Sequence, residues 1–290
     1  CGRGFICAEQ RTLMQDSKQC GTILELDGVS VSFPNGMRAL KSCSLKFKRG
    51  EFAVLLGPSG SGKSTLLRCL NLLQRPSLGS VRAPWLGAEP SPGEERAHRQ
   101  RAGMVFQQHQ LILSMGVLRN VMMGMAGRVG LWRSLFPDDA MRLEALECLE
   151  RVGLGHKALN RASELSGGEQ QRVGIARTLA QKPEVMLADE PVASLDPARA
   201  SRLMSLLKGI CRDAGMTAVV SLHQVALARE FADRVIGLRA GEVVFDAPAR
   251  ALDDAAVLEI YGDSAALPQA AAKPLPRRAA RLAIEPVPAL

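Results

Sequence analysis

The fold is decided by residues 52–70, which read FAVLLGPSGSGKSTLLRCL. The apolar residues 52–56 predict a buried strand, and the apolar run that begins at Leu66 predicts a helix. Between them stands a glycine-rich loop. Backbone N–H groups that turn inward, followed by the positive end of a helix dipole, suit a triphosphate. The order strand, loop, helix therefore predicts a nucleotide site. The alternative is a turn without a ligand, but four fixed positions match by accident in roughly one such chain in a hundred.

Each residue type in this loop suits phosphate binding. Glycines allow a backbone conformation and a close approach of phosphate that a Cβ would block. Lys63 can place a point charge on the β- and γ-phosphates, and the Ser64 hydroxyl can ligate Mg²⁺. The residues predicted to bind the nucleotide here are Gly57, Pro58, Ser59, Gly60, Ser61, Gly62, Lys63, Ser64 and Thr65.

Composition limits the class of protein. The chain has 290 residues, 47% of them apolar, which is enough for one large or two small domains with a buried core. Charges and glycines interrupt every apolar run, so no membrane span is expected. The net charge of +8 is spread along the chain, and nucleic-acid binding is not expected. Seven scattered cysteines without a CxxC pair favour reduced thiols. The polar first twenty residues do not resemble a secretory signal.

Two strands are expected ahead of the loop. Residues 23–33 and Met37–Phe47 alternate partly between apolar and polar residues around a Pro-Asn-Gly turn, which predicts an antiparallel pair. Phe33 can stack on an adenine ring, although a core phenylalanine is the other interpretation. Residues 84–101, rich in Pro, Gly, Glu and Arg, are typical of an exposed loop.

Polar residues follow three further predicted strands. Gln107 follows a short apolar strand, Asp189 and Glu190 follow another, and His223 follows a third. Because ligands bind outside the carboxyl ends of strands in α/β sheets, we expect these side chains at one edge. Beside a phosphate loop, Asp189 suits a Mg²⁺ shell and Glu190 suits deprotonation of the attacking water. In isolation each position also fits a role without catalysis or binding: a solvated glutamine, an acidic cap or turn, or a structural histidine.

The middle of the chain is helical. Residues 140–152 keep apolar positions three or four apart and end at a glycine, within a helical region from Val117 to Leu159. The apolar segment 130–137 inside it is a candidate partner surface. Ser166 can cap a helix that opens with Gly167 and Gly168, which makes a second anion site or simply a capped helix.

Strand, loop and helix alternate from Phe52 to His223, which predicts an α/β fold around a mostly parallel sheet. Residues 235–245 predict a closing hairpin around Ala240 and Gly241. Beyond Tyr261 the chain is rich in Ala and Pro, which is typical of disorder.

Taken together, these stretches resemble the ATP-binding cassette (ABC) family of transporter ATPases over about residues 23–245. Residues 57–65 match Walker A, and Gln107 matches the Q-loop. Residues 165–171 match the LSGGQ signature, and 185–190 match Walker B with its catalytic glutamate. Residues 194–196 match the D-loop, and His223 the switch histidine. By this resemblance Phe33 is the aromatic that stacks on adenine.

The resemblance implies a P-loop NTPase (RecA-like) parallel core with an antiparallel β subdomain and an inserted α-helical subdomain. Its implied bounds are 1–21 for an N-terminal extension, 22–249 for the nucleotide-binding domain with its helical part at about 108–163, and 250–290 for a C-terminal helix and tail. ATP and Mg²⁺ are the implied cofactors. The implied metal residues are Ser64, Gln107 and Asp189, and the implied catalytic residues are Glu190, His223 and Gln107.

It also implies partners. Two copies would bind head to tail, with Ser166, Gly167 and Gly168 of one enclosing the ATP on the other. Separate integral-membrane permease subunits, served by a periplasmic binding protein, would place this chain on the cytoplasmic face of a bacterial inner membrane.

A narrower resemblance is to the ATP-binding subunit of bacterial phosphonate importers, carried by residues 117–121, 127–137 and 188–197. Departures are His109-Gln110-Leu111, Glu169 in place of the commoner Gln, and residues 84–101. The alternatives are an accessory ATPase of phosphonate breakdown, an importer ATPase for another small solute, and an ABC protein that acts on nucleic acid. The last usually carries two cassettes or long charged insertions, which this chain lacks.

Overall fold

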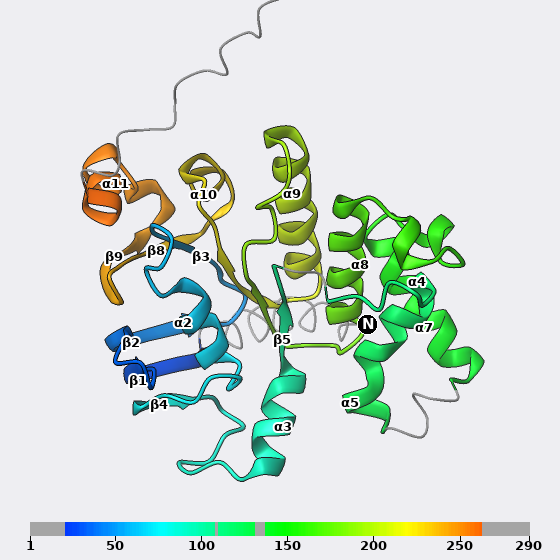
Figure 1. The fold of residues 1–290 in the computed structure, drawn as a ribbon, viewed down its shortest axis with the longest axis horizontal. Helices are drawn as coiled ribbons and strands as arrows, with labels where there is room; N and C mark the ends of the chain where they lie inside the picture. Colours follow the sequence, from blue (N-terminus) through cyan, green and yellow to red (C-terminus); the bar gives the residue numbers. More distant parts are fainter. Residues whose placement is uncertain (1–20, 108–109, 131–136, 263–290) are drawn as a thin grey trace, which may run out of the picture.

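The computed structural model describes residues 21–107, 110–130 and 137–262. Within these ranges the chain forms two sheets with helices around them (Figure 1). Several sequence predictions lie outside the described residues. They concern the extension before residue 21, His109, positions 131–136 of the apolar segment, and the tail after residue 262.

The smaller sheet is antiparallel and has the strand order β2-β1-β4. Its strands are β1 (Thr22–Ser32), β2 (Arg38–Lys48) and β4 (Leu78–Arg82). The register pairs Leu26 with Leu45 and Val31 with Leu40, which places apolar side chains of both strands on one buried face. The antiparallel pair expected ahead of the phosphate loop is confirmed.

The larger sheet has the strand order β5-β6-β7-β3-β8-β9. Its strands are β3 (Phe52–Leu56), β5 (Ala102–Val105), β6 (Val185–Ala188), β7 (Thr217–Ser221), β8 (Arg234–Arg239) and β9 (Glu242–Pro248). All neighbours run parallel except β9, which pairs antiparallel with β8 as the predicted hairpin. The carboxyl ends of β3, β5, β6 and β7 therefore meet at one edge.

Every residue of β3, β5, β6 and β7 is buried, because apolar cores cover both faces of the larger sheet. Val54 and Leu56 belong to the core under the helices that follow β6 and β7. Ala53 and Leu55 belong to the core shared with the smaller sheet and the helix after the phosphate loop. The alternation of β3 between two cores explains its unbroken apolar sequence.

Helices cover the sheet in two groups (Figure 1). The first group lies along the strands, with α9 (Pro197–Asp213), α10 (Val225–Phe231), the short turn η4 (Ala249–Ala251) and α11 (Asp254–Tyr261) in the core of one face. Helix α2 (Lys63–Leu70) lies on the opposite face, in the core shared with the smaller sheet. Helix α2 begins at Lys63, ahead of the apolar run at Leu66, because its first turn is built by the loop residues themselves.

The second group forms a helical lobe beside β5 (Figure 1). Its elements are α4 (Val117–Met122), η1 (Met123–Met125), α5 (Ala126–Val129), α7 (Asp139–Arg151), η2 (Gly155–Lys157), η3 (Ala162–Glu164) and α8 (Gly167–Leu179). Helices α4, α7 and α8 pack against one another, and Met141, Ala145 and Leu149 of α7 are buried there. The helical pattern predicted for this region is confirmed.

One prediction was wrong. The segment 84–101, interpreted as an exposed loop, contains the helix α3 (Pro92–Arg101). Ser91 caps it and forms a capping box with Glu94, and Pro92 takes the first helical position, where a missing N–H costs nothing. The helix has few apolar residues to show a period, but it buries His98 completely.

Among the described residues, no helix is both long enough and apolar enough to cross a bilayer.

Candidate functional site

The phosphate loop joins β3 to α2 and is shaped by other parts of the chain. Gly57 has φ +151°, and a Cβ there would lie 2.2 Å from the Leu238 carbonyl oxygen of β8. Gly62 has φ +106°, and a Cβ there would lie 2.6 Å from the Ala39 carbonyl oxygen of β2. Both glycines are needed because protein backbone, not only phosphate, approaches them.

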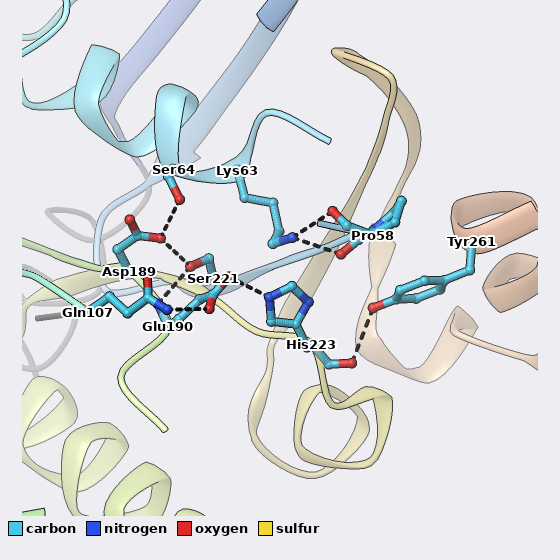
Figure 2. A network of polar contacts seen from close by, with 10 residues as sticks. Pro58, Lys63, Ser64, Gln107, Asp189, Glu190, Ser221, His223 and Tyr261 are labelled. Carbon is cyan, nitrogen blue, oxygen red and sulfur yellow. Dashed lines mark hydrogen bonds and ion pairs between the residues drawn. The ribbon is translucent and has the colours of Figure 1, made fainter. Parts of the chain in front are cut away.

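Lys63 points its ammonium into this loop (Figure 2). Its Nζ donates to the carbonyl oxygens of Gly57 at 2.8 Å and Pro58 at 3.0 Å, and the residue is 4% exposed. Burial lowers the pKa of Lys63, while the carboxylates of Glu190 and Asp189 oppose that shift. The cation is therefore held at the loop, close to two acids.

Asp189 and Ser64 form a pair of oxygen donors at the start of α2. The Ser64 hydroxyl donates to Asp189 Oδ1 at 2.9 Å, and Asp189 is 4% exposed at the end of β6. Hydroxyl and carboxylate oxygens are the donors that Mg²⁺ prefers, so these two side chains fit that ion. Gln107 belongs to the same edge, but its amide is directed to Glu190 rather than to this pair.

The loop also fits a nucleotide by what it leaves unpaired. Ser61 Oγ is buried and has no hydrogen-bond partner among the described residues. An unpaired buried hydroxyl is costly unless a polar ligand completes it.

Glu190 lies at the centre of a polar cluster (Figure 2). Gln107 Nε2 donates to Glu190 Oε2 at 3.1 Å, and His223 Nε2 contacts Glu190 Oε1. The backbone of Glu190 has φ +46°, an uncommon conformation for a residue with a side chain. Its N–H donates to Ser221 Oγ at 2.9 Å, and that hydroxyl donates to Asp189 Oδ1 at 2.9 Å. One serine thus holds both acids.

The structure brings the predicted residues Lys63 and Ser64 of α2 together with those that follow the strands, which are Gln107, Asp189, Glu190 and His223. Ser59, Gly60 and Thr65 lie in the loop and the first turn of α2. Phe33 lies one residue beyond β1, half-buried against the core of the smaller sheet.

Ser166, Gly167 and Gly168 lie elsewhere, at the start of α8 in the helical lobe (Figure 1). Ser166 caps α8 in a capping box: its N–H donates to Glu169 Oε2 at 2.8 Å, and Glu169 N–H donates to its Oγ at 3.4 Å. Hydrogen bonds from Ser166 lower the pKa of Glu169. No hydrogen bond or ion pair described for these three residues reaches the phosphate loop.

A hollow of about 370 Å³ opens between α8 and α9. Its lining includes one acid and three arginines, in the set Ser166, Gly168, Glu169, Arg172, Leu195, Arg199 and Arg202. The start of α8 is thus accompanied by positive charge and faces open space rather than this chain's own loop.

Two residues of the site were not predicted from the sequence. Ser221 is the last residue of a buried strand, and only the pairing of β6 with β7 brings it to the acids. Tyr261, at the end of α11, donates a hydrogen bond to the His223 carbonyl at 3.3 Å. Neither residue belongs to a short motif, so no local signal marks them.

The chain is similar in sequence to proteins of a known family. The sequence profile described as ABC transporter matches residues 40–193. The phosphonates import ATP-binding protein PhnC 3 of Nostoc sp. is 50% identical over 243 residues, which cover 83% of this chain and 93% of that one.

Two further relatives have similar coverage. The phosphite import ATP-binding protein PxtA of Stutzerimonas stutzeri is 54% identical, across 82% of this chain and 87% of its own. The phosphonates import ATP-binding protein PhnC 2 of Cupriavidus metallidurans is 55% identical, across 82% and 86%.

Solved structures agree in fold. A dimeric ATP-binding cassette in a post-hydrolysis state, bound to ADP and Pi, has a TM-score of 0.70 and 36% identity, covering 79% of this chain and 99% of that one. A subunit of the cbiONQ ABC transporter complex from Clostridium perfringens has a TM-score of 0.71 and 31% identity, covering 79% and 89%.

Proposed function

The chain belongs to the ABC transporter family, and on that premise we propose that it is the ATP-hydrolysing subunit of an importer for phosphonates. The observation that carries the proposal is its identity of 50% and 55% to two phosphonate import ATP-binding proteins over more than four fifths of this chain. The residues that the proposal needs for hydrolysis lie together at the edge of the parallel sheet.

The chemistry assigned to this edge is water attack on the γ-phosphorus of ATP. Glu190 takes a proton from the water, oxygen bonds to phosphorus, and the bond from phosphorus to the β,γ-bridging oxygen breaks to release ADP. Gln107 and His223 each contact one carboxylate oxygen of Glu190, so they orient it. Lys63 exchanges loop carbonyls for phosphate oxygens.

Ser64 and Asp189, with Gln107 nearby, would hold Mg²⁺, which when bound neutralises phosphate charge. Phe33 would stack on the adenine.

A complete site would need two copies in head-to-tail order. In this part of the proposal, Ser166, Gly167 and Gly168 of one copy add the start of α8 to the nucleotide held by the other. The support within this chain is the open basic hollow beside Ser166. Closure around ATP and reopening after hydrolysis would then move a membrane partner.

We also propose where the chain lies in the cell and which proteins it binds. The chain would bind integral-membrane permease subunits on the cytoplasmic face of a bacterial inner membrane, with a periplasmic binding protein presenting the substrate. No nucleic acid is expected. The bounds proposed from the resemblance are kept: a nucleotide-binding domain over 22–249, with its helical part at about 108–163.

The test is transport-coupled hydrolysis. The full complex with its permease and binding protein, reconstituted in vesicles, should hydrolyse ATP faster when an alkylphosphonate is added. Phosphate esters, amino acids and sulfate should give no stimulation. A Glu190→Gln complex is the matched control for contaminating ATPase. Stimulation by amino acids instead would refute the assigned substrate class.

Phosphite is the second candidate substrate, because the phosphite import relative is 54% identical to this chain. Phosphite shares the tetrahedral anionic phosphorus of a phosphonate and lacks the organic substituent. Titrating both compounds against the same complex decides between them: the true substrate should half-saturate stimulation at the lower concentration.

A further inference from the structure

Tyr261 places a hydroxyl behind the site, outside every motif considered above. It is the last residue of α11, and its hydroxyl donates to the backbone oxygen of His223 at 3.3 Å (Figure 2). Burial raises the pKa of Tyr261, and a hydrogen bond with the Gly57 backbone opposes that rise. The group therefore stays a protonated donor at neutral pH, and its hydrogen bond reaches the segment that carries His223.

Helix α11 holds that hydroxyl in a fixed place. Ile260 is fully buried, and a Cβ on Gly237 of β8 would lie 2.4 Å from Ile260 Cγ1, so the helix sits directly on the strand. Arg239 Nη1 donates to the Glu259 carbonyl at 3.1 Å. At the other end, Arg229 Nη2 bonds Asp254 Oδ1 at 2.8 Å. Contacts at both ends stop the helix from sliding.

The segment that carries His223 is anchored one residue earlier, where the Leu222 N–H donates to the Leu55 carbonyl at 3.0 Å. It connects β7 to α10, and Gln224 at the helix start makes no side-chain cap. Within the described ranges, no side chain other than Tyr261 hydrogen-bonds to the His223 carbonyl. The imidazole itself is 37% exposed and contacts Glu190. A small rotation of this backbone would therefore move the imidazole away from the carboxylate.

We propose that Tyr261 is a positioning residue: its hydroxyl ties the His223 backbone to helix α11 and so holds the imidazole against Glu190. The inference rests on the proposed ATP hydrolysis. Tyr261 itself touches neither the water nor the phosphate in this assignment. It acts through His223, which makes α11 part of the catalytic apparatus although it lies beyond the motif-bearing chain.

The test is Tyr261→Phe, which keeps the ring and removes the hydrogen bond. Steady-state ATP hydrolysis by the full chain should show kcat reduced about threefold to tenfold, as expected for one lost positioning bond. The KM for ATP should change less than about twofold, because the phosphate contacts remain. A kcat equal to that of the wild type would overturn the proposal. So would a raised KM with unchanged kcat, which would mean that the hydroxyl serves only the loop.

Two controls separate positioning from folding. Leu258→Ala changes an exposed residue of α11 and should leave kcat unchanged. Ile260→Ala weakens the docking of α11 and should lower the melting temperature, whereas Tyr261→Phe should leave it within about 2 °C of the wild type. If the kcat loss of Tyr261→Phe came with an equal fall in melting temperature, the role would be structural.

A double-variant cycle adds a readout that packing cannot produce. Adding Tyr261→Phe to His223→Gln should cost less than it costs alone, because both changes remove the same alignment. Fully additive effects would count against the coupling. Failure of the proposed function is distinguishable: in that case the wild-type chain would neither bind a fluorescent ATP analogue nor hydrolyse ATP, whatever residue 261 is.

Discussion

The two anion-binding regions of this chain differ in how far each is completed by its own residues. Around the phosphate loop, Lys63, Asp189 and Glu190 all have partners within the chain. At the start of α8, the backbone opens onto a hollow lined by Arg172, Arg199 and Arg202. In the first region, side chains of this chain hold one another in place around the loop. The second is a surface that needs another body to cover it, which is what a head-to-tail pair of chains would provide.

Glu190→Gln alters the phosphate-loop region alone and should remove nearly all turnover. The amide keeps the size of the side chain but cannot accept the proton, so we expect turnover to fall about a thousandfold with ATP affinity retained. Size-exclusion chromatography with ATP should show a stable dimer, since the bridging nucleotide is not consumed. A monomer under these conditions would contradict the role given to the start of α8.

Mixing two inactivated variants tests whether the phosphate loop of one chain and the start of α8 of another complete one site. Lys63→Ala should lower ATP affinity about a hundredfold through loss of charge-assisted bonds, and Ser166→Arg should block the start of α8 while leaving that affinity intact. Each chain alone should be inactive. Random pairing makes half of the dimers mixed, each with one intact site, so the mixture should recover about a quarter of wild-type activity.

The control for that experiment is Lys46→Ala, at an exposed lysine of β2, which should bind ATP normally. Each inactivated variant alone, at the same total concentration, gives the background ATPase activity. Absence of recovery in the mixture, with both chains folded, would mean that the two regions do not meet across a dimer.

Ser221→Ala tests how the phosphate-loop region holds its two acids. The change leaves the Glu190 N–H without its acceptor and Asp189 without one donor. We expect kcat to fall about tenfold, and the melting temperature to fall by a few degrees because a buried N–H loses its acceptor. Ser163→Ala, an exposed serine in the helical lobe, is the matched control and should be neutral. Equal kinetics for both variants would show that the acids do not depend on this hydroxyl.

A buried histidine supports the end of α2. His98 is fully buried; its Nε2 bonds the Leu70 carbonyl at 2.7 Å, and Trp85 Nε1 donates to its Nδ1 at 3.0 Å. Burial lowers the pKa of His98 in the folded chain, so the unfolded chain binds more protons near its ordinary pKa of about 6.5. Stability is therefore present above that pKa and is lost as the pH falls through it.

Chemical denaturation at pH 7.5 and 5.5 should show this loss. The wild type should lose about 1 kcal/mol more than His98→Gln over that interval. The exposed His156, as His156→Gln, should behave like the wild type. An identical pH dependence in all three proteins would exclude His98 as the titrating group.

The fold and most of the site could be predicted because their signals are local. The strand, loop and helix around Lys63 follow from consecutive residues, and the position of Gln107, Glu190 and His223 at one edge follows from the direction of parallel strands. The helix α3 was missed since its charged sequence shows no apolar period, although Ser91 and Glu94 form a recognisable capping box.

Long-range contacts were not predictable in the same way. Ser221 becomes a partner of the acids only through the lateral pairing of β6 with β7. Tyr261 reaches His223 across 38 positions of sequence, through a helix docked on β8. Such contacts depend on how elements pack, which no window of residues records.

The wall behind the phosphate loop has a consequence for how this chain can be divided. Leu238 closes against Gly57, and the Gly241 N–H donates to the Ser61 carbonyl at 3.1 Å, so the hairpin β8–β9 braces the loop from outside. A fragment that stopped ahead of residue 234 would still contain every motif. Its phosphate loop, however, would lack the hairpin that supports it from outside. For this chain, the motifs alone are therefore not sufficient to form the nucleotide site.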